Sequence, residues 1–288
     1  MGSGSTIGLA LGAGGARGMA HILVCEVFDE LGLKPDTIAG TSIGAVIGAV
    51  WASGLSGGEM RERACAFYAK RREVLGRLWQ SRPRAVAELV RTRSLSTQFD
   101  AEIILQKFVP DFSVLPETFE ELSVPLKVIA CDFYGWREAV LSTGPLRSAI
   151  AASIAIPALF RSVLIDGRVH VDGGACNPLP FDRVGDKDLI VACDVTGGPV
   201  GDPTRHPRML ECAVGSAQIS MQSIITEKLR TQQPDILVRP EVYGIFVLDF
   251  LKTQAILDMN VAFKDDLKRR LARAIELKTE RPAISAIG

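Results

Sequence analysis

Short apolar runs alternate along this chain with glycine-rich turns and with longer stretches of helical periodicity. Apolar runs at Ile7–Leu11 and 37–39 are predicted as strands, and helical patterns follow them at 19–31 and Ile43–Ala52. The order strand, turn, helix, strand forms a βαβ unit, which lays its strands side by side in a parallel sheet. We therefore expect an α/β fold with a central, mostly parallel sheet flanked by helices.

The second half of the chain continues this alternation. In its last predicted helix, an apolar residue recurs at every fourth position (Phe263, Leu267, Leu271 and Ile275). We interpret this stripe as a face that packs on the core, with a helix lying on a membrane as the alternative. Further strands are predicted at 125–132, 136–142, 163–167 (with a turn), 168–171, 188–194 and 234–240, and further helices at 146–160, Met209–Thr231 and 260–277.

Residues 57–110 carry amphipathic helical patterns that are rich in arginine and poor in acidic residues. We expect this segment to be a helical, cap-like insertion within a single domain at 7–279. Its basic face predicts either a solvated surface on the core, which we favour, or a contact with anionic lipid. Residues 1–6 are interpreted as a flexible start or the remnant of a tag, and 280–288 as a tail.

Composition narrows the class of protein. The 288 residues carry a formal net charge of zero, which gives no indication of a nucleic-acid partner. No apolar run reaches the roughly 18 residues of a membrane span, and the first residues do not resemble a signal peptide. The six cysteines are scattered without a Cys-x-x-Cys pair, so we expect buried thiols in a reducing cytoplasm, with neither a disulfide framework nor a metal site.

The sequence Gly40-Thr-Ser42-Ile-Gly44 has the Gly-x-Ser-x-Gly pattern of a nucleophile elbow. It lies between a predicted strand and a predicted helix, as that chemistry requires. Glycine on both sides of the serine lets the strand and the helix approach each other closely. The following helix directs unpaired N–H groups of its N-terminus at developing negative charge. Ser42 is therefore a candidate nucleophile.

A second glycine-rich turn, at residues 12–18, lies between the first strand and the first helix. A dinucleotide fingerprint is excluded because Arg17 stands where glycine or alanine is needed, and a P-loop lacks its Gly-Lys-Ser/Thr. The remaining interpretation is a cradle of backbone N–H groups for an oxyanion, built by Gly14, Gly15 and Ala16 with Ile43 after the serine. Arg17 would either lock the turn or add positive charge, next to Gly18.

These two motifs together resemble the start of patatin-like phospholipases, which carry Gly-Gly-Gly-x-Arg/Lys-Gly followed by Gly-x-Ser-x-Gly. Here the first glycine is replaced by Ala13. Asp172-Gly173-Gly174 resembles the second catalytic signature of that family and lies 130 residues after Ser42. The segment with Ala152, Ser153 and Pro157 resembles a third, which shapes the pocket floor, and we do not assign catalysis to Ser153.

The resemblance implies a three-layer fold and a catalytic dyad in which Asp172 accepts the proton of Ser42, without histidine, cofactor or metal. It implies a serine acyl hydrolase that cleaves lipid esters in the manner of a phospholipase A or lysophospholipase. The implied partner is a lipid or acyl-ester substrate. A peripheral contact with a membrane surface and a location in the cytoplasm are separate expectations, which come from the arginine-rich segment and from the unpaired cysteines.

Several alternatives stay open. The order Ser42, Asp172, His206 is that of an α/β-hydrolase triad, and His170 lies two residues from Asp172 on a predicted strand. Against the triad, the elbow follows a single βαβ unit, whereas in α/β-hydrolases it usually follows several strands. An acyltransferase on the same dyad and a non-catalytic lipid-binding regulator are the other two alternatives.

Overall fold

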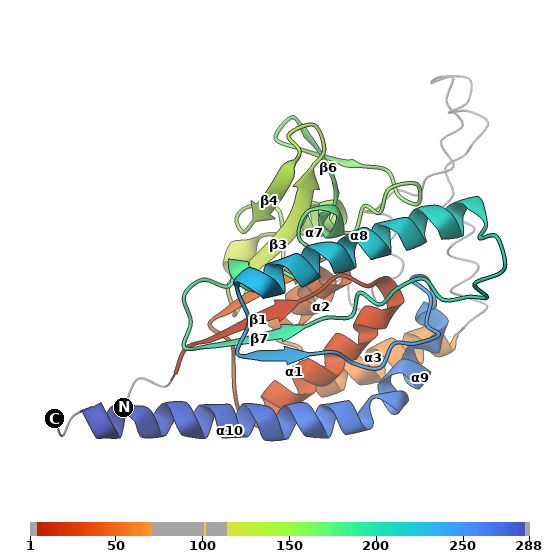
Figure 1. Cartoon of the computed structure of the whole chain (residues 1–288). Coiled ribbons are helices and arrows are strands. Elements are labelled where there is room, and N and C mark those ends of the chain that lie inside the picture. Colours follow the sequence, from red (N-terminus) through yellow and green to blue (C-terminus); the bar gives the residue numbers. More distant parts are fainter. Residues whose placement is uncertain (1–4, 71–100, 102–113, 286–288) are drawn as a thin grey trace.

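The protein is described here by a computed structural model, which covers residues 5–70, 101 and 114–285 (Figure 1). The strands are β1 (Ile7–Leu11), β2 (Thr37–Thr41), β3 (Leu126–Asp132), β4 (Arg137–Leu141), β5 (Val163–Ile165), β6 (Arg168–Asp172), β7 (Leu189–Cys193) and β8 (Ile236–Val238). The helices are α1 (His21–Glu30), α2 (Ile43–Ala52), α3 (Gly57–Ala69), α7 (Leu146–Ser153), α8 (Met209–Thr231), α9 (Thr253–Met259) and α10 (Val261–Ser285). Short 3₁₀ turns include η1 (Gly15–Ala20), η3 (Phe119–Glu121), η4 (Gly173–Ala175), η5 (Phe181–Arg183) and η6 (Phe250–Lys252).

One sheet runs through the described chain in the order β5-β6-β3-β2-β1-β7-β8, with β4 also paired to β3. The central strands are parallel, because β1 pairs with β2 and β7, β2 pairs with β3, and β7 pairs with β8 in that sense. The pairs β3–β4, β3–β6 and β5–β6 are antiparallel. The expected α/β fold with a central, mostly parallel sheet is thus confirmed, with an antiparallel part at one end.

The strands place large and small side chains on opposite faces of the sheet. On β1, Leu9 and Leu11 belong to the main core, which is shared with α1, α2, α3, α7, α9 and α10. Between them, Ala10 points to the other face, where it lies in register with Ala39 and Ala192. This row of alanines leaves room for Phe181 and for the inner side of α8. The result is a helix–sheet–helix arrangement, with α8 in front of the sheet in Figure 1.

Strands β2 and β6 pair with the same edge of β3, one after the other and in opposite directions. Residues 128–129 of β3 pair with both β2 and β4, so these two strands flank β3 on opposite edges. Since β4 occupies one edge of β3 as far as Asp132, β6 pairs with residues 130–132 on the opposite edge. This is the same edge to which β2 is paired at residues 126–129. Thr41 lies opposite Ile129, and Asp172 lies opposite Ala130. The carboxyl ends of β2 and β6 consequently face each other.

Most predicted elements are present, with shifts at their ends. Helices α2 and α8 have the predicted bounds, and the stripe on α10 packs on the core, with Leu267 and Leu271 fully buried. The helix predicted at 146–160 ends at Ser153, because the ring of Pro157 would clash with the Ser153 carbonyl in a continued helix. The helix predicted at 19–31 begins earlier, as the 3₁₀ turn η1, and α10 extends to Ser285.

The arginine-rich segment predicted at 57–110 is described only in part. It begins with α3, whose N-terminus carries a capping box between Ser56 and Glu59. Residues 71–100 and 102–110 lie outside the described chain, so the cap-like insertion and its lipid contact stay predictions. Among the helices of the described residues, none combines the length and the apolar character that crossing a membrane requires.

Gly44 lies where β1 and α2 approach each other closely, and a substitution at this position tests that contact. A Cβ atom added there would lie 2.1 Å from the Leu11 carbonyl oxygen, which is backbone and cannot move aside. We expect Gly44→Ala to lower the free energy of unfolding by about 1–3 kcal/mol or more, through overpacking. Equilibrium urea denaturation measures this loss.

Gly58, on the exposed side of α3, provides the matched control, since nothing lies within 4 Å of an added Cβ. Gly58→Ala is expected to raise the free energy of unfolding by about 0.5–1 kcal/mol. Equal effects of the two substitutions would contradict the close β1–α2 contact.

Candidate active site

Ser42 occupies the sharp turn between β2 and α2. Its backbone has φ 55° and ψ −122°, a conformation that residues other than glycine rarely adopt and that costs on the order of 1–3 kcal/mol. A Cβ on Gly40 would lie 2.6 Å from the backbone of Ala45, so the turn closes only with glycine at that position. The structure thus places Ser42 on a strained turn at the N-terminus of α2, with its side chain almost fully buried.

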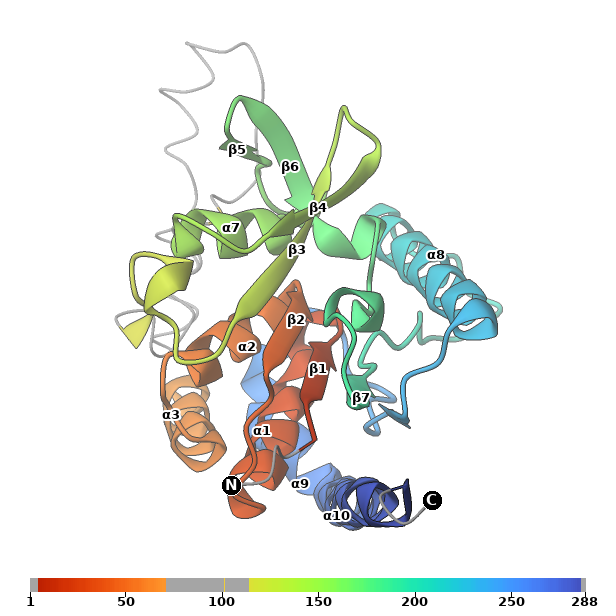
Figure 2. The ribbon, with the colours of Figure 1, turned by 90° about the vertical axis from the view of Figure 1, so that its left-hand side faces the viewer.

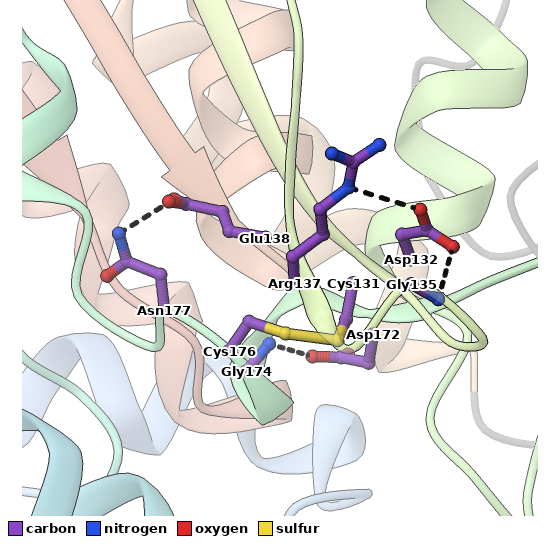
Figure 3. The surroundings of a disulfide bond; sticks show 9 residues. All are labelled: Cys131, Asp132, Gly135, Arg137, Glu138, Asp172, Gly174, Cys176 and Asn177. Carbon is purple, nitrogen blue, oxygen red and sulfur yellow. Dashed lines mark hydrogen bonds and ion pairs between the residues drawn. A yellow bond between two sulfur atoms is a disulfide. The ribbon is translucent and has the colours of Figure 1, made fainter.

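Asp172 ends β6 and faces Ser42 across the junction of the two strands. The Ser42 hydroxyl donates a hydrogen bond to Asp172 Oδ2 at 2.6 Å. The Gly174 N–H donates to the other oxygen, Oδ1, at 2.7 Å (Figure 3). Gly173 lets this turn lie against β3, because an added Cβ would be 2.1 Å from the Ile129 carbonyl oxygen. Strand and turn therefore fix both carboxylate oxygens.

Burial controls the protonation of Asp172. Removal from water raises the pKa of this carboxyl from 3.8 to about 6, although the hydrogen bonds from Ser42 and Gly174 oppose the shift. A carboxylate with a pKa of about 6 is largely ionised at neutral pH and yet accepts a proton more readily than an exposed aspartate. Asp172 is thus suited to take the Ser42 proton.

The expectation that the cysteines are unpaired thiols is wrong for one pair. Cys131 on β3 and Cys176 after η4 form a disulfide (Figure 3). A second link lies beside it, where the Thr41 hydroxyl donates to the Asn177 carbonyl oxygen at 2.8 Å. Both links attach the turn that follows Asp172 to the neighbouring strands. The sequence gives no signal for this pair, because 45 residues separate the two cysteines and only the antiparallel pairing of β6 on β3 brings them together.

The glycine-rich turn supplies fewer free N–H groups than expected. Ala16 N–H donates to the Val247 carbonyl oxygen at 2.8 Å, so the assignment of Ala16 as an oxyanion donor is corrected. Within the described chain, the N–H groups of Gly14, Gly15 and Ile43 have no acceptor. Gly18 packs against the Ile43 side chain, which places η1 beside the first turn of α2.

Arg17 holds loops together and is almost fully buried. Its guanidinium donates to the carbonyl oxygens of Ile245 at 2.7 Å, Thr196 at 2.6 Å and Gly198 at 3.2 Å. Burial lowers the pKa of Arg17, and the nearby Asp249 partly opposes that shift. Of the two roles expected for Arg17, these contacts describe a lock on the turn rather than a charge directed at a ligand.

Ser153, to which no catalytic role was assigned, contacts the elbow directly. Its buried hydroxyl accepts a hydrogen bond from Ser42 N–H at 2.8 Å and donates to the Ile129 carbonyl oxygen at 2.5 Å. The Ser42 N–H is therefore engaged and cannot serve an oxyanion in this arrangement. The motif containing Ala152, Ser153 and Pro157 was visible in the sequence, but its contact with Ser42 spans 111 residues and depends on the tertiary fold.

No histidine contacts the Ser42–Asp172 pair, and all three histidines lie in the described chain. His21 is buried against the Gly12 carbonyl oxygen, and burial lowers its pKa to about 4. His170 Nδ1 contacts the Arg168 carbonyl oxygen, and His206 lies in the exposed loop before α8. In the described residues, no group of three or more His, Cys, Asp or Glu side chains is arranged to hold a metal ion.

Removing the Ser153 hydroxyl is expected to impair the elbow. Ser153→Ala would leave the buried Ser42 N–H without an acceptor, at a cost of about 1–3 kcal/mol. If Ser42 is the nucleophile, we expect kcat to fall about tenfold with little change in KM. Steady-state ester hydrolysis and thermal unfolding measure the two effects.

The control for this change is Ser223→Ala, which removes an exposed helix hydroxyl bonded to the Ile219 carbonyl oxygen. It should leave both quantities unchanged. Full retention of kcat in Ser153→Ala would contradict the positioning role.

The raised pKa of Asp172 makes stability depend on pH. The folded carboxyl binds its proton up to about pH 6 and the unfolded one only up to 3.8, so stability falls as pH rises through this window. Asp172→Asn removes that cost. We expect the variant to exceed the wild type by up to about 3 kcal/mol at about pH 8 and to lose the advantage at about pH 4.

Urea unfolding across this pH range measures the difference, with Asp166→Asn, an exposed carboxylate on the β5–β6 turn, as control. A variant that gains nothing on the alkaline side would contradict the assignment of a buried, destabilising charge.

Comparison with known proteins places this site in a family. A family model described as patatin-like phospholipase matches residues 9–184. An uncharacterized NTE family protein of Mycobacterium tuberculosis (strain ATCC 25618 / H37Rv) is 37% identical over 200 residues, which cover 68% of this chain and 50% of that protein. Patatin-like phospholipase domain-containing protein 6 of Homo sapiens is 30% identical over 199 residues, covering 67% of this chain and 14% of that protein.

Lysophospholipase NTE1 of Kluyveromyces lactis is 23% identical over 303 residues, covering 96% of this chain and 20% of that protein. The chain therefore spans half or less of the length of these curated relatives. Among solved structures, VipD from Legionella pneumophila has a TM-score of 0.49 at 13% identity, covering 91% of this chain and 67% of that chain. The matched residues 9–184 include the elbow, Ser153 and Asp172, and the chain belongs to the patatin-like phospholipase family.

Proposed function

We propose that this protein is a serine acyl hydrolase that cleaves acyl esters of lipids through a Ser42–Asp172 dyad. The observation that carries the proposal is the 2.6 Å hydrogen bond from the Ser42 hydroxyl to a buried carboxylate. A serine hydroxyl is a weak nucleophile until an adjacent base accepts its proton. Membership in the patatin-like phospholipase family supports a lipid ester as the class of substrate.

In the first half-reaction, Ser42 Oγ attacks the ester carbonyl carbon while its proton passes to Asp172 Oδ2. The resulting tetrahedral intermediate collapses, the bond to the alcohol oxygen breaks, and the alcohol leaves with the proton held by Asp172. An acyl group then remains on Ser42. In the second half-reaction, Asp172 accepts a proton from water as the water attacks the acyl carbonyl. Collapse releases a fatty acid and returns the proton to Ser42.

The negative charge of the intermediate needs donors that are already in place. Ile43 N–H is the first helical amide of α2, where the helix dipole adds positive potential. The unpaired N–H groups of Gly14 and Gly15 lie on the turn that packs against that end of α2. We assign the oxyanion to these three groups, because Ser42 N–H and Ala16 N–H are already engaged.

The arrangement of the histidines favours a dyad over a triad. The Asp172 carboxylate accepts hydrogen bonds from the Ser42 hydroxyl and from Gly174 N–H, which occupy one oxygen each. A triad would require a histidine between the serine and the carboxylate. At 2.6 Å the two side chains are already in direct contact, so no imidazole fits between them in this arrangement.

The proposal is tested by fluorophosphonate labelling and by hydrolysis of p-nitrophenyl esters of increasing chain length. We expect the wild type to be labelled, Ser42→Ala to lose labelling and turnover, and Asp172→Asn to lose about 10²- to 10⁴-fold in kcat/KM, as is typical of a missing general base. His206→Ala is the matched control and should retain wild-type activity. The dependence on chain length reports the size of the acyl pocket.

Each rival function has its own outcome. Dependence on His206 would replace the dyad by a triad hydrolase. Preferential transfer of the acyl group to an added lysolipid would indicate an acyltransferase. A folded wild type that is neither labelled nor active would indicate a non-catalytic lipid-binding protein.

A further inference from the structure

Two neighbouring hairpins carry large apolar side chains that no described part of the chain covers. Phe133, Tyr134 and Trp136 lie on the β3–β4 turn with 50%, 76% and 91% of their surface exposed, and Leu164 on β5 is 67% exposed. We call these four residues the apolar tip. Figures 1 and 2 agree that both hairpins project from one end of the molecule, opposite α10.

Three members of the apolar tip, Leu164, Phe133 and Tyr134, adjoin one another because the strands hold Leu164 and Phe133 in register. Leu164 pairs with Val169, and Phe133 N–H donates to the Val169 carbonyl oxygen at 2.9 Å, which continues the β3–β6 ladder by one residue. Residues paired across neighbouring strands project from the same face of a sheet. Leu164, Val169 and Phe133 therefore form a row, and the Phe133 ring packs edge to face on Tyr134 at its end.

Polar contacts at its base hold the tip rigidly. The buried Asp132 carboxylate accepts from Gly135 N–H at 3.0 Å and pairs with Arg137 at 3.5 Å (Figure 3). It also accepts from Arg168 Nε at 2.7 Å. Two hairpins are thus fixed to one another through a single carboxylate. The turn backbone that carries the aromatic side chains is thus fixed before binding, which lowers the entropic cost of binding.

Charge and shape indicate what the tip contacts. Residues 132–137 and 161–168 contain three arginines against two aspartates, a formal charge of +1, and the exposed Arg137 and Arg168 pair with the buried Asp132. Tryptophan and tyrosine between exposed arginines are typical of side chains at the boundary between lipid and water, where the ring is apolar and its polar atom stays hydrated. The tip is a projection rather than a groove, as insertion into a lipid surface requires. The arginine excess matches anionic headgroups.

The distance between the tip and the Ser42–Asp172 pair suits this contact. Asp172 lies opposite Ala130, and Phe133 is three residues further along β3, which corresponds to about 10 Å of strand. Interfacial segments commonly sink about 5–10 Å into the headgroup region. A tip inserted to that depth would bring the site close to the ester carbonyls of a phospholipid.

We propose that the apolar tip is the surface by which this protein docks on a phospholipid bilayer that contains anionic lipid. The proposal rests on the lipid-hydrolase function proposed above, and it adds the surface of the protein that contacts the bilayer containing the substrate. The β3–β4 turn does not touch the ester that is cleaved, but on this proposal it determines activity on bilayers.

Docking is tested with vesicles of phosphatidylcholine and phosphatidylglycerol, using Ser42→Ala protein so that the lipid stays intact. We expect this protein to co-sediment with the vesicles, and the further substitutions Tyr134→Ser and Trp136→Ser to weaken partitioning about tenfold or more. Leu277→Ser, which removes an exposed leucine on α10 at the opposite end of the molecule, is the control and should bind as its parent does. Thermal unfolding checks that all variants are folded.

Activity separates this proposal from the proposed function. With Ser42 restored, the Tyr134→Ser/Trp136→Ser variant should hydrolyse a soluble short-chain p-nitrophenyl ester at the wild-type rate and vesicle phospholipid about tenfold more slowly. If the protein has no hydrolytic activity but its binding to vesicles depends on the tip, the proposed function is contradicted and the docking surface is supported.

Normal hydrolysis together with vesicle binding that is indifferent to the tip would overturn the docking surface alone. A dimer in sedimentation velocity that the tip substitutions dissociate would also overturn it, because the tip would then be an interface between two copies.

Discussion

The candidate site depends on a single constraint, which is that two strands share one edge of β3. Strand β2 reaches this edge from one side and β6 from the other, and they stop at adjacent residues of β3, Ile129 and Ala130. Ser42, the proposed nucleophile, follows one strand end, and the Asp172 carboxylate forms the other. No long side chain is needed to bring them together, and a serine and an aspartate, both short, are held at 2.6 Å.

Burial then gives this geometry its chemical character. The same close packing that forces glycine at positions 40, 44 and 173 excludes water from the carboxylate. Exclusion of water raises the pKa of Asp172, and the strained turn at Ser42 is stabilised by the hydroxyl of Ser153. Two features of the site therefore lower the stability of the folded protein, namely the buried charge of Asp172 and the unfavourable backbone conformation of Ser42.

Local signals were readable in the sequence, and long-range contacts were not. The elbow, the helix after it and the strand before Asp172 each have a pattern within about ten residues, and the structure contains all three. The contact between Ser153 and Ser42, the engagement of Ala16 N–H by Val247, and the Cys131–Cys176 pair join residues that are far apart in the chain. Periodicity carries no information about such pairs, because they are fixed by the antiparallel return of β6 and by the late loop before α9.

Strand β6 has a consequence beyond placing the carboxylate. Its first residue, Arg168, is held by the base of the β3–β4 turn, and its last residue is Asp172, four positions further on. The projecting hairpins and the carboxylate are therefore attached to opposite ends of one five-residue strand. An insertion or deletion of one residue within β6 would turn one of these two side chains to the opposite face of the sheet. The length of β6 is therefore fixed by the two ends that it serves.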